Sequence, residues 1–138
     1  MFRNLPPAID LFTSPVRLRA DGTADPAAEH ERRAVLTGTD SGLWTLTAFR
    51  AADDRAVHAD VWERHPNGSE VLCVFSGTLQ VHLRDEPAPG AVLTRGAAYV
   101  VPAGTWHRLS VVEPAELISL TPRPGTQHER ADPAEVRS

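Results

Sequence analysis

The chain has 138 residues, which is the length of one ordinary domain. Its composition, with 41% hydrophobic and 23% charged residues, lies in the globular range and excludes a disordered or fibrous protein. The 14 basic residues are all arginine, against 18 acidic ones, so the net charge is -4. This balance argues against nucleic acid or an anionic membrane as the main partner.

The sequence shows no export or membrane segment. Pro6 and Pro7 interrupt the N-terminal apolar stretch, and no run approaches the ~20 apolar residues that span a bilayer. A single cysteine, Cys73, excludes a disulfide framework. These features predict a cytoplasmic protein.

The N-terminal residues 1–40 carry the weakest pattern. Residues 25–36 are the segment with helical character, because Asp25 could cap its start and Pro26 suits the first helical position. Gly38 follows the end of this segment, as is typical of a helix C-terminus. We therefore expect residues 1–40 to form an irregular or short-helical extension.

The rest of the pattern is that of short β-strands separated by turns, with Ser76-Gly77 as one of the turns. The expected strands are residues 43–49, 56–63, 70–75, 79–84, 98–101, 107–112 and 115–121. Many short strands at regular spacing predict an all-β sandwich or small barrel. We expect a single domain with its barrel over about residues 42–121, followed by a loop and a loose tail over residues 122–138.

A hairpin is expected around Asn67-Gly68, because both residues tolerate the positive φ of a type I′ turn. Centring the turn there sets His65 opposite Glu70. Directly opposed residues share a face, and so do residues two apart on one strand. Glu63, His65 and Glu70 would then project from the same side of the hairpin. A polar cluster of this kind beside an apolar interior is what a metal or substrate pocket requires.

Two spacings in the chain resemble the motifs of the cupin family. The first spacing is Glu63-x-His65-x4-Glu70-x6-Gly77, with glutamate where the family usually has its first histidine. The second spacing is Gly96-x5-Pro102-x-Gly104-x2-His107. The second lacks only the usual asparagine, at whose place Val111 stands. The sequence around these motifs is similar to that of small single-domain bacterial cupins of unassigned activity.

The resemblance implies a cupin β-barrel of two packed antiparallel sheets, of the jelly-roll type, with the motif residues pointing inward. His65, Glu70 and His107 match three metal ligands of the family. Two imidazoles and a carboxylate suit a divalent ion with open positions. Glu63 either joins them as a fourth ligand or stands beside the metal as a catalytic acid/base. The metal is left open among iron, manganese, nickel and zinc.

A small organic molecule is the ligand that the resemblance implies, and we expect Tyr99 and Val111 to contact it. Trp62, Cys73 and Phe75 fall on the outward parity of their strands. They would form an apolar face of the kind that single-domain cupins use for a homodimer. His58 is expected on a solvated face and His128 in a mobile tail.

Two functions of different kinds fit these residues. The favoured one is a metal-dependent cupin enzyme that acts on a small molecule by oxygenation, isomerisation or lyase/cyclase chemistry. The alternative is a small-molecule binding or sensing module, with or without a metal. A dimeric structural remnant with a filled interior is a third hypothesis. The fold hosts all of these, so the fold alone does not choose among them.

Overall fold

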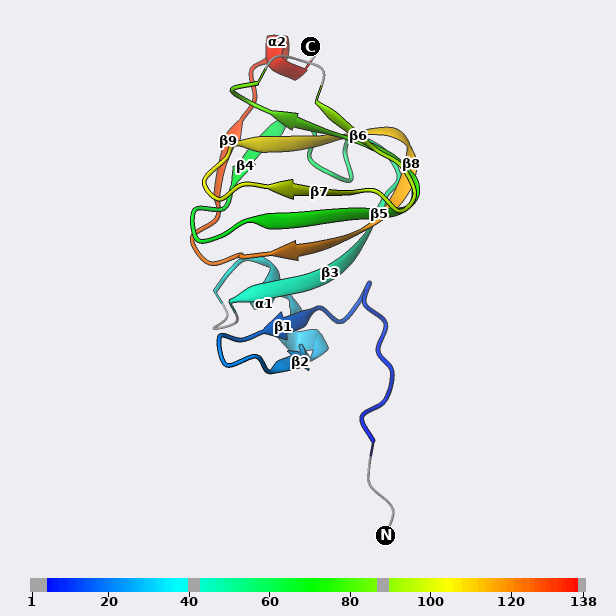
Figure 1. Cartoon of the computed structure of the whole chain (residues 1–138), viewed down its shortest axis with the longest axis vertical. Helices are drawn as coiled ribbons and strands as arrows, with labels where there is room; N and C mark the ends of the chain where they lie inside the picture. The colour runs from blue at the N-terminus through cyan, green and yellow to red at the C-terminus, as the bar shows by residue number, and fades with distance from the viewer. Residues whose placement is uncertain (1–4, 40–42, 87–89, 137–138) are drawn as a thin grey trace.

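The computed structural model describes residues 5–39, 43–86 and 90–136. The strands form a barrel, and the N-terminal elements extend it at one end (Figure 1). The elements in chain order are β1 (Val16–Leu18), β2 (Ala24–Pro26), η1 (Glu29–Glu31), α1 (Arg32–Leu36), β3 (Trp44–Ala51), β4 (Val61–Arg64), β5 (Glu70–Leu83), β6 (Ala91–Leu93), β7 (Ala98–Val101), β8 (His107–Thr121), β9 (Gln127–Arg130) and α2 (Pro133–Val136).

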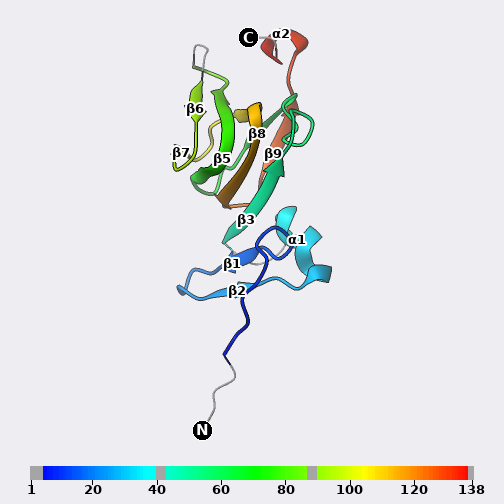
Figure 2. The same cartoon turned by 90° about the vertical axis from the view of Figure 1, so that its right-hand side faces the viewer.

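Two long strands, β5 and β8, pair antiparallel along most of their length and belong to both sheets of the barrel. The C-terminal half of β8 lies between β3 and the first half of β5, which gives the order β2-β1-β3-β8-β5-β7. The N-terminal half of β8 lies between β4 and the second half of β5, which gives β9-β4-β8-β5-β6. Figure 2 shows β5, β6 and β7 on one side and β3 and β9 on the other. The prediction of an all-β jelly-roll barrel with two antiparallel sheets is confirmed.

Both long strands bend where they pass from one sheet to the other. The β5–β8 ladder shifts its register between Val74 and Leu79. Gly77 lies in this bend with a φ of 75°, and a Cβ there would stand 2.0 Å from the carbonyl oxygen of Pro114. Only glycine fits such a close approach. The expected Ser76-Gly77 turn is therefore a bulge inside one strand.

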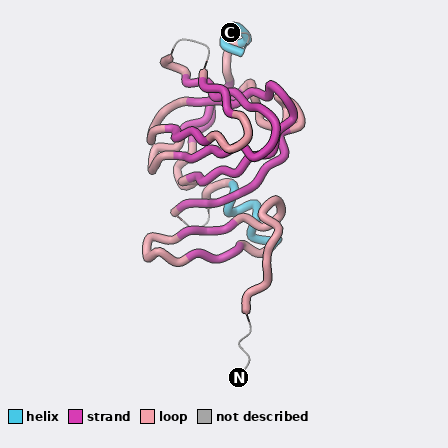
Figure 3. Tube along the Cα trace, turned by 45° about the vertical axis from the view of Figure 1, so that its right-hand side comes forward, coloured by secondary structure: helices cyan, strands magenta, loops and turns pink. Residues whose placement is uncertain are grey.

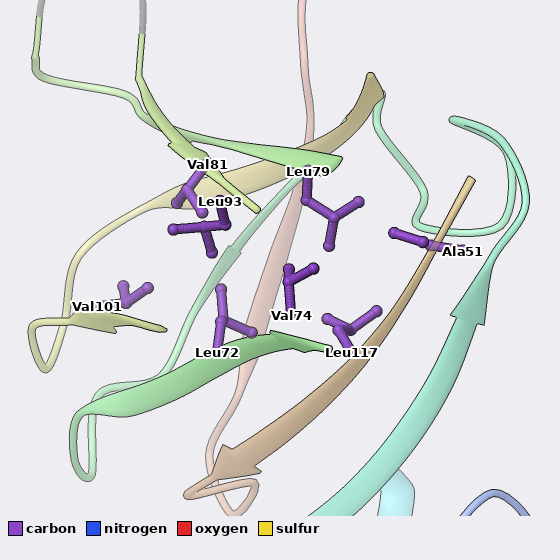
Figure 4. Packing of buried hydrophobic residues seen from close by; sticks show 9 residues of the cluster. Ala51, Leu72, Val74, Leu79, Val81, Leu93, Val101 and Leu117 are labelled. Atoms are coloured by element: carbon purple, nitrogen blue, oxygen red, sulfur yellow. The ribbon is translucent and has the colours of Figure 1, made fainter. Parts of the chain in front are cut away.

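The core lies between the sheets, and alternate residues of β5 provide its centre. The side chains of Leu72, Val74, Leu79 and Val81 are at most 2% exposed and point into the barrel (Figure 4). Leu117 of β8 meets them from the opposite strand. Each such side chain stabilises the fold by roughly 1.5–3 kcal/mol. The alternation of apolar residues thus decides which face of β5 turns inward.

Helical structure among the described residues is confined to the N-terminal segment and the C-terminal end (Figure 3). The helix expected over residues 25–36 is wrong in its first half. Asp25 belongs to β2 and does not cap a helix, because its carboxylate accepts hydrogen bonds from Arg17 at 2.6 Å and Arg19 at 3.1 Å. No helix in the described part of the chain is long and apolar enough to cross a membrane.

Two further expectations are corrected. The strand expected over residues 56–63 begins only at Val61, because residues 53–60 form bends and turns. The C-terminal residues are not a loose tail, because residues 127–130 form β9, which pairs with β4 in antiparallel register. Backbone hydrogen bonds to β4 hold this segment in place, and no sequence pattern indicated that partner.

Candidate metal centre

Four of the predicted site residues come together from three strands. Glu63 lies on β4, Glu70 begins β5, His107 begins β8 and His65 follows directly after β4. The register pairs Glu63 with His107 across β4 and β8. The hairpin expected around Asn67 is wrong, because β4 pairs with β8 and β9 and not with β5. The chain instead crosses from one sheet to the other between β4 and β5, and the four side chains still converge.

The four side chains lie within bonding reach of a single ion. His65 Nε2 is 2.9 Å from Glu63 Oε1 and 3.4 Å from Glu70 Oε2. His107 Nε2 is 3.0 Å from Glu70 Oε1 and 4.0 Å from Glu63 Oε1. One ligand atom from each residue lies within 4.8 Å of all the others. His65, Glu70 and His107 are buried, and Glu63 is partly exposed.

The tautomer of His65 follows from its outer hydrogen bonds. The Thr126 hydroxyl donates its hydrogen to the Arg123 carbonyl oxygen at 2.7 Å. It can therefore only accept from His65 Nδ1, which lies 2.8 Å away. The proton of a neutral His65 ring then sits on Nδ1, so Nε2 turns its lone pair toward the carboxylates. An outer partner of this kind is what orients a histidine ligand.

The same argument holds for His107. Its Nδ1 lies 3.1 Å from the Thr105 carbonyl oxygen, which can only accept a hydrogen bond. Nε2 of the neutral ring therefore faces Glu70 Oε1 with a lone pair. Glu70 is itself oriented, because the Thr121 hydroxyl donates to its Oε2 at 2.6 Å.

These contacts fit a divalent cation. Lone pairs of two neutral rings that face carboxylate oxygens repel unless a proton or a metal ion lies between them. His65 Nε2 is buried and faces the carboxylate oxygens of Glu63 and Glu70. A tetrahedral ion with bonds of about 2.1 Å has ligand–ligand separations of about 3.4 Å. The distances of 2.9 to 4.0 Å measured here span that value.

The same contacts shift the pKa values of these groups. Burial alone would raise the pKa of Glu70, but the hydrogen bonds from His107 and His65 outweigh it and lower the pKa to about 2. Burial would lower the pKa of His65, yet the Glu63 and Glu70 carboxylates raise it to about 9. The pKa of Glu63 is lowered by hydrogen bonds from His128 and His65, against burial. A metal ion must therefore displace a proton from His65.

His128 is a site residue that the sequence interpretation left in a mobile tail. It lies on β9 directly opposite Glu63, and its Nε2 is 2.8 Å from Glu63 Oε2. The hydrogen bond to Glu63 raises the pKa of His128, while burial and the charges of His65 and Arg123 lower it. Its side chain is 58% exposed, so His128 connects Glu63 with solvent.

A cavity of about 570 Å³ opens beside the cluster. Most of its lining surface is apolar, as is usual for small-molecule sites, although eight of its 15 lining residues are polar or charged. The apolar lining residues are Phe49, Ala56, Val57, Val61, Leu72, Leu109 and Leu117. The polar and charged ones are His58, Glu63, Glu70, His107, Arg108, Ser119, Arg123 and His128.

Several expected positions differ from the structure. Tyr99 and Val111 do not line this cavity and pack against the core, so the structure lends no support to a substrate contact by either residue. His58 is exposed, as expected for a solvated face, and it also lines the cavity. Residue 58 lies in a turn and not in the expected strand.

The expected outer apolar face is wrong for Trp62. This side chain is only 3% exposed, because the guanidinium groups of Arg84 and Arg108 lie 5.6 Å and 5.2 Å from the centre of its ring. Phe75 is 37% exposed on a different sheet, where its ring lies 6.2 Å from that of Phe12. Trp62 and Phe75 therefore do not share a face.

The sequence interpretation missed Arg123 and Thr126 as site residues. Thr126 and His128 are two apart, as residues on one face of a strand are, but the proline and glycine before them indicated a loop. No local pattern in the sequence indicated Arg123.

Comparison with known proteins agrees with this architecture. The family model described as a cupin domain matches residues 56–121. A Klebsiella pneumoniae protein with a double-stranded β-helix domain is 18% identical, with 64% of this chain and 75% of that chain covered and a TM-score of 0.50. A cupin-2 domain protein from Shewanella frigidimarina is 24% identical, with coverages of 61% and 74% and a TM-score of 0.47. The search of curated proteins finds no match.

The matched residues contain both motif spacings and all four clustered side chains, from Glu63 to His107. The Klebsiella pneumoniae structure shares the fold, at an identity too low to inform on substrate. Residues 56–121 thus match the cupin domain, and the barrel has the fold of these proteins.

Proposed function

We propose that this cupin binds one divalent metal ion through Glu63, His65, Glu70 and His107 and acts on a small organic molecule in the adjoining cavity. One observation carries the proposal. Two buried imidazoles turn Nε2 toward carboxylate oxygens at 2.9 and 3.0 Å, while each Nδ1 is held by an outer acceptor. Protein histidines that ligate metal ions are oriented in this way.

Glu63 is assigned as a ligand through Oε1, which faces both imidazoles, while Oε2 faces His128. Two carboxylates offset the charge of a divalent ion, so the loaded site would be neutral. The assignment is tested with Glu63→Gln. Loss of metal supports a ligand role, whereas retained metal with lost activity would support the acid/base role instead.

A divalent ion in this site supplies Lewis-acid chemistry, or oxygen chemistry if it is iron. The apolar walls of the cavity, among them Phe49, Leu72 and Leu117, exclude water and hold the apolar part of a ligand. Glu63 and the half-exposed His128 form a hydrogen-bonded pair that could carry a proton between solvent and the cavity. Oxygenation, isomerisation and lyase/cyclase chemistry remain the candidate reactions, with iron, manganese, nickel or zinc as the metal.

The first experiment is elemental analysis of the tag-free protein beside His65→Ala and His107→Ala. We expect near-stoichiometric metal in the native chain and its loss in both variants. His58→Ala is the matched control, because His58 lines the cavity outside the cluster. Circular dichroism confirms that each variant is folded. Absence of metal from the native protein, even after reloading, would overturn the proposal.

An enzyme and a binding module are distinguished by what happens to the ligand. Small molecules that copurify with the protein are identified by mass spectrometry and returned to metal-loaded and metal-free protein. Metal-dependent conversion to a product supports an enzyme. Release of the unchanged molecule supports a binding or sensing module.

We also propose a homodimer through the outer face of the sheet in which β5 lies between β8 and β7. Val71 pairs with Val100 on one side and Leu120 on the other, so the three side chains form one apolar row. Val100 is 58% exposed, whereas Val71 and Leu120 are half-buried. A Val100→Asp substitution is expected to convert the dimer to monomers, which light scattering after gel filtration detects. Val92→Asp is the control, because Val92 is 57% exposed but lies on β6.

A further inference from the structure

One cationic side chain of the cavity has no anionic partner among the described residues. Arg123 follows β8 and lines the same cavity as Glu63 and Glu70. Its Nε is buried without a hydrogen bond, and its Nη1 reaches the Leu36 carbonyl only at 3.4 Å. A buried arginine nitrogen without an acceptor is costly unless a ligand supplies one.

The other arginine of the cavity, Arg108, also has a buried Nε without a hydrogen bond, but its Nη groups are held by the protein. Arg108 donates from Nη1 to the Ala59 carbonyl at 3.3 Å and from Nη2 to the Glu135 carbonyl at 2.7 Å. The charges of Glu135 and Asp54 also act on Arg108. Arg108 is thus anchored by the protein itself, and Arg123 is the arginine left for a ligand.

The position of Arg123 is fixed by its backbone. Its carbonyl oxygen accepts hydrogen bonds from the amide of Thr126 at 3.1 Å and from the Thr126 hydroxyl at 2.7 Å. The same hydroxyl accepts from His65, so the turn that carries Arg123 is part of the support of the metal cluster. The ring of Phe49 lies 5.9 Å from the guanidinium carbon. A guanidinium and an apolar wall therefore stand side by side.

The charges of the site leave a place for one anion. A divalent ion would offset Glu63 and Glu70, and Arg123 would then leave the cavity with a positive charge. An arginine fork matches the two oxygens of a carboxylate.

We propose that the cavity takes a small monocarboxylic acid with an apolar body, whose carboxylate is bound by Arg123. The inference rests on the proposed function, since the bound metal is what offsets Glu63 and Glu70. The competing explanation is that Arg123 only holds the end of α1 through the Leu36 carbonyl. The two explanations differ in whether the residue discriminates an acid from its uncharged analogue.

The test uses the zinc-loaded full chain and two probes of the same shape, 3-phenylpropanoate and 3-phenylpropanamide, with calorimetry as the measurement. The wild type is expected to bind the acid at least about tenfold more tightly than the amide. Arg123→Gln is expected to abolish this preference and leave amide binding unchanged. Arg123→Lys keeps the charge without the fork and is expected to keep part of the preference. Arg95→Gln makes the same change in an exposed turn and should have no effect.

Three results would overturn the assignment. One is a wild type that does not prefer the acid, and another is an equal loss of acid and amide binding in both Arg123 variants. The third is a preference that survives in Arg123→Gln, because the carboxylate would then bind the metal. Zinc content is measured in the same samples. If zinc is not retained, the proposed function fails. The role of Arg123 is then decided by whether acid binding relative to amide binding differs between metal-free wild type and metal-free Arg123→Gln.

Discussion

The barrel interior has two halves that the same two strands build differently. In one half, Leu79 and Val81 of β5 are completely buried in an apolar core. In the other half, β5 begins with Glu70 and β8 begins with His107, and a cavity lies beside them. Glu70 and Leu72 share a face of one strand, so a candidate metal ligand and a core residue are only two positions apart. The filled half provides stability, and the hollow half contains the candidate metal site.

The polar half is costly to fold, because buried carboxylates and imidazoles lose their hydration. Thr121 and Thr126 offset part of this cost by hydrogen bonds to Glu70 and His65. The two halves should therefore respond differently to substitution. Changes in the filled half should alter stability alone, and changes in the hollow half should mainly alter metal affinity.

The largest effect is expected from Leu79→Ala in the filled half. Leu79 is completely buried, so its truncation leaves a cavity and should lower the free energy of unfolding by about 2–5 kcal/mol. Urea unfolding measures this change. Metal bound per folded molecule should stay the same. Val112→Ala, at a position that is 57% exposed, is the control, and metal loss in folded Leu79→Ala would show that the halves are coupled.

Thr126→Val is expected to weaken metal binding by about 10–100-fold, because it removes the acceptor that orients His65. Competition with a chromogenic chelator measures the affinity. Thr126→Ser keeps the hydroxyl and should bind metal nearly as well as the wild type. Equal affinity of the valine and serine variants would contradict the role assigned to the hydroxyl.

His128→Ala is expected to weaken metal binding only several-fold. His128 also holds a carboxylate of the cluster, but its side chain is 58% exposed and water can replace it. The same chelator competition measures the effect, with His58→Ala as a control on an exposed histidine. A loss of metal affinity as large as that of Thr126→Val would mean that solvent exposure does not weaken the contact between His128 and Glu63.

A change of pH should alter the free energy of unfolding of the metal-free protein by up to about 3 kcal/mol. The pKa of His65 is raised from 6.5 to about 9 on folding, so its contribution to stability is complete below pH 6.5 and is lost as pH rises through 9. The pKa of Glu70 falls from 4.5 to about 2, so its contribution is lost as pH falls from 4.5 through 2. Stability should be highest between about pH 4.5 and pH 6.5.

Urea unfolding of metal-free protein at about pH 6 and about pH 9 tests the alkaline loss. His65→Gln removes the titrating group and should remove that loss. A wild type whose stability rises between these two pH values would contradict the placement of a protonated His65 between two carboxylates.

Much of the fold could be predicted from local patterns. Alternation placed Leu79 and Val81 on an inward face, and Gly77, expected in a turn, marks the bend of β5. Partners distant in sequence could not be predicted. The strands expected on either side of Ser76-Gly77 are one strand because β8 pairs with both parts, and nothing local reveals a partner 24 or more residues away.

The sequence by itself determined which side chains form the candidate site. Glu63, His65, Glu70 and His107 occur at spacings that bring them together even though the expected hairpin does not form. Only the tertiary structure decided what surrounds them. It pairs β9 with β4, sets His128 against Glu63 and brings Arg123 into the cavity. The physical reason is that a spacing fixes neighbours along one strand, whereas contacts between sheets depend on how the whole barrel closes.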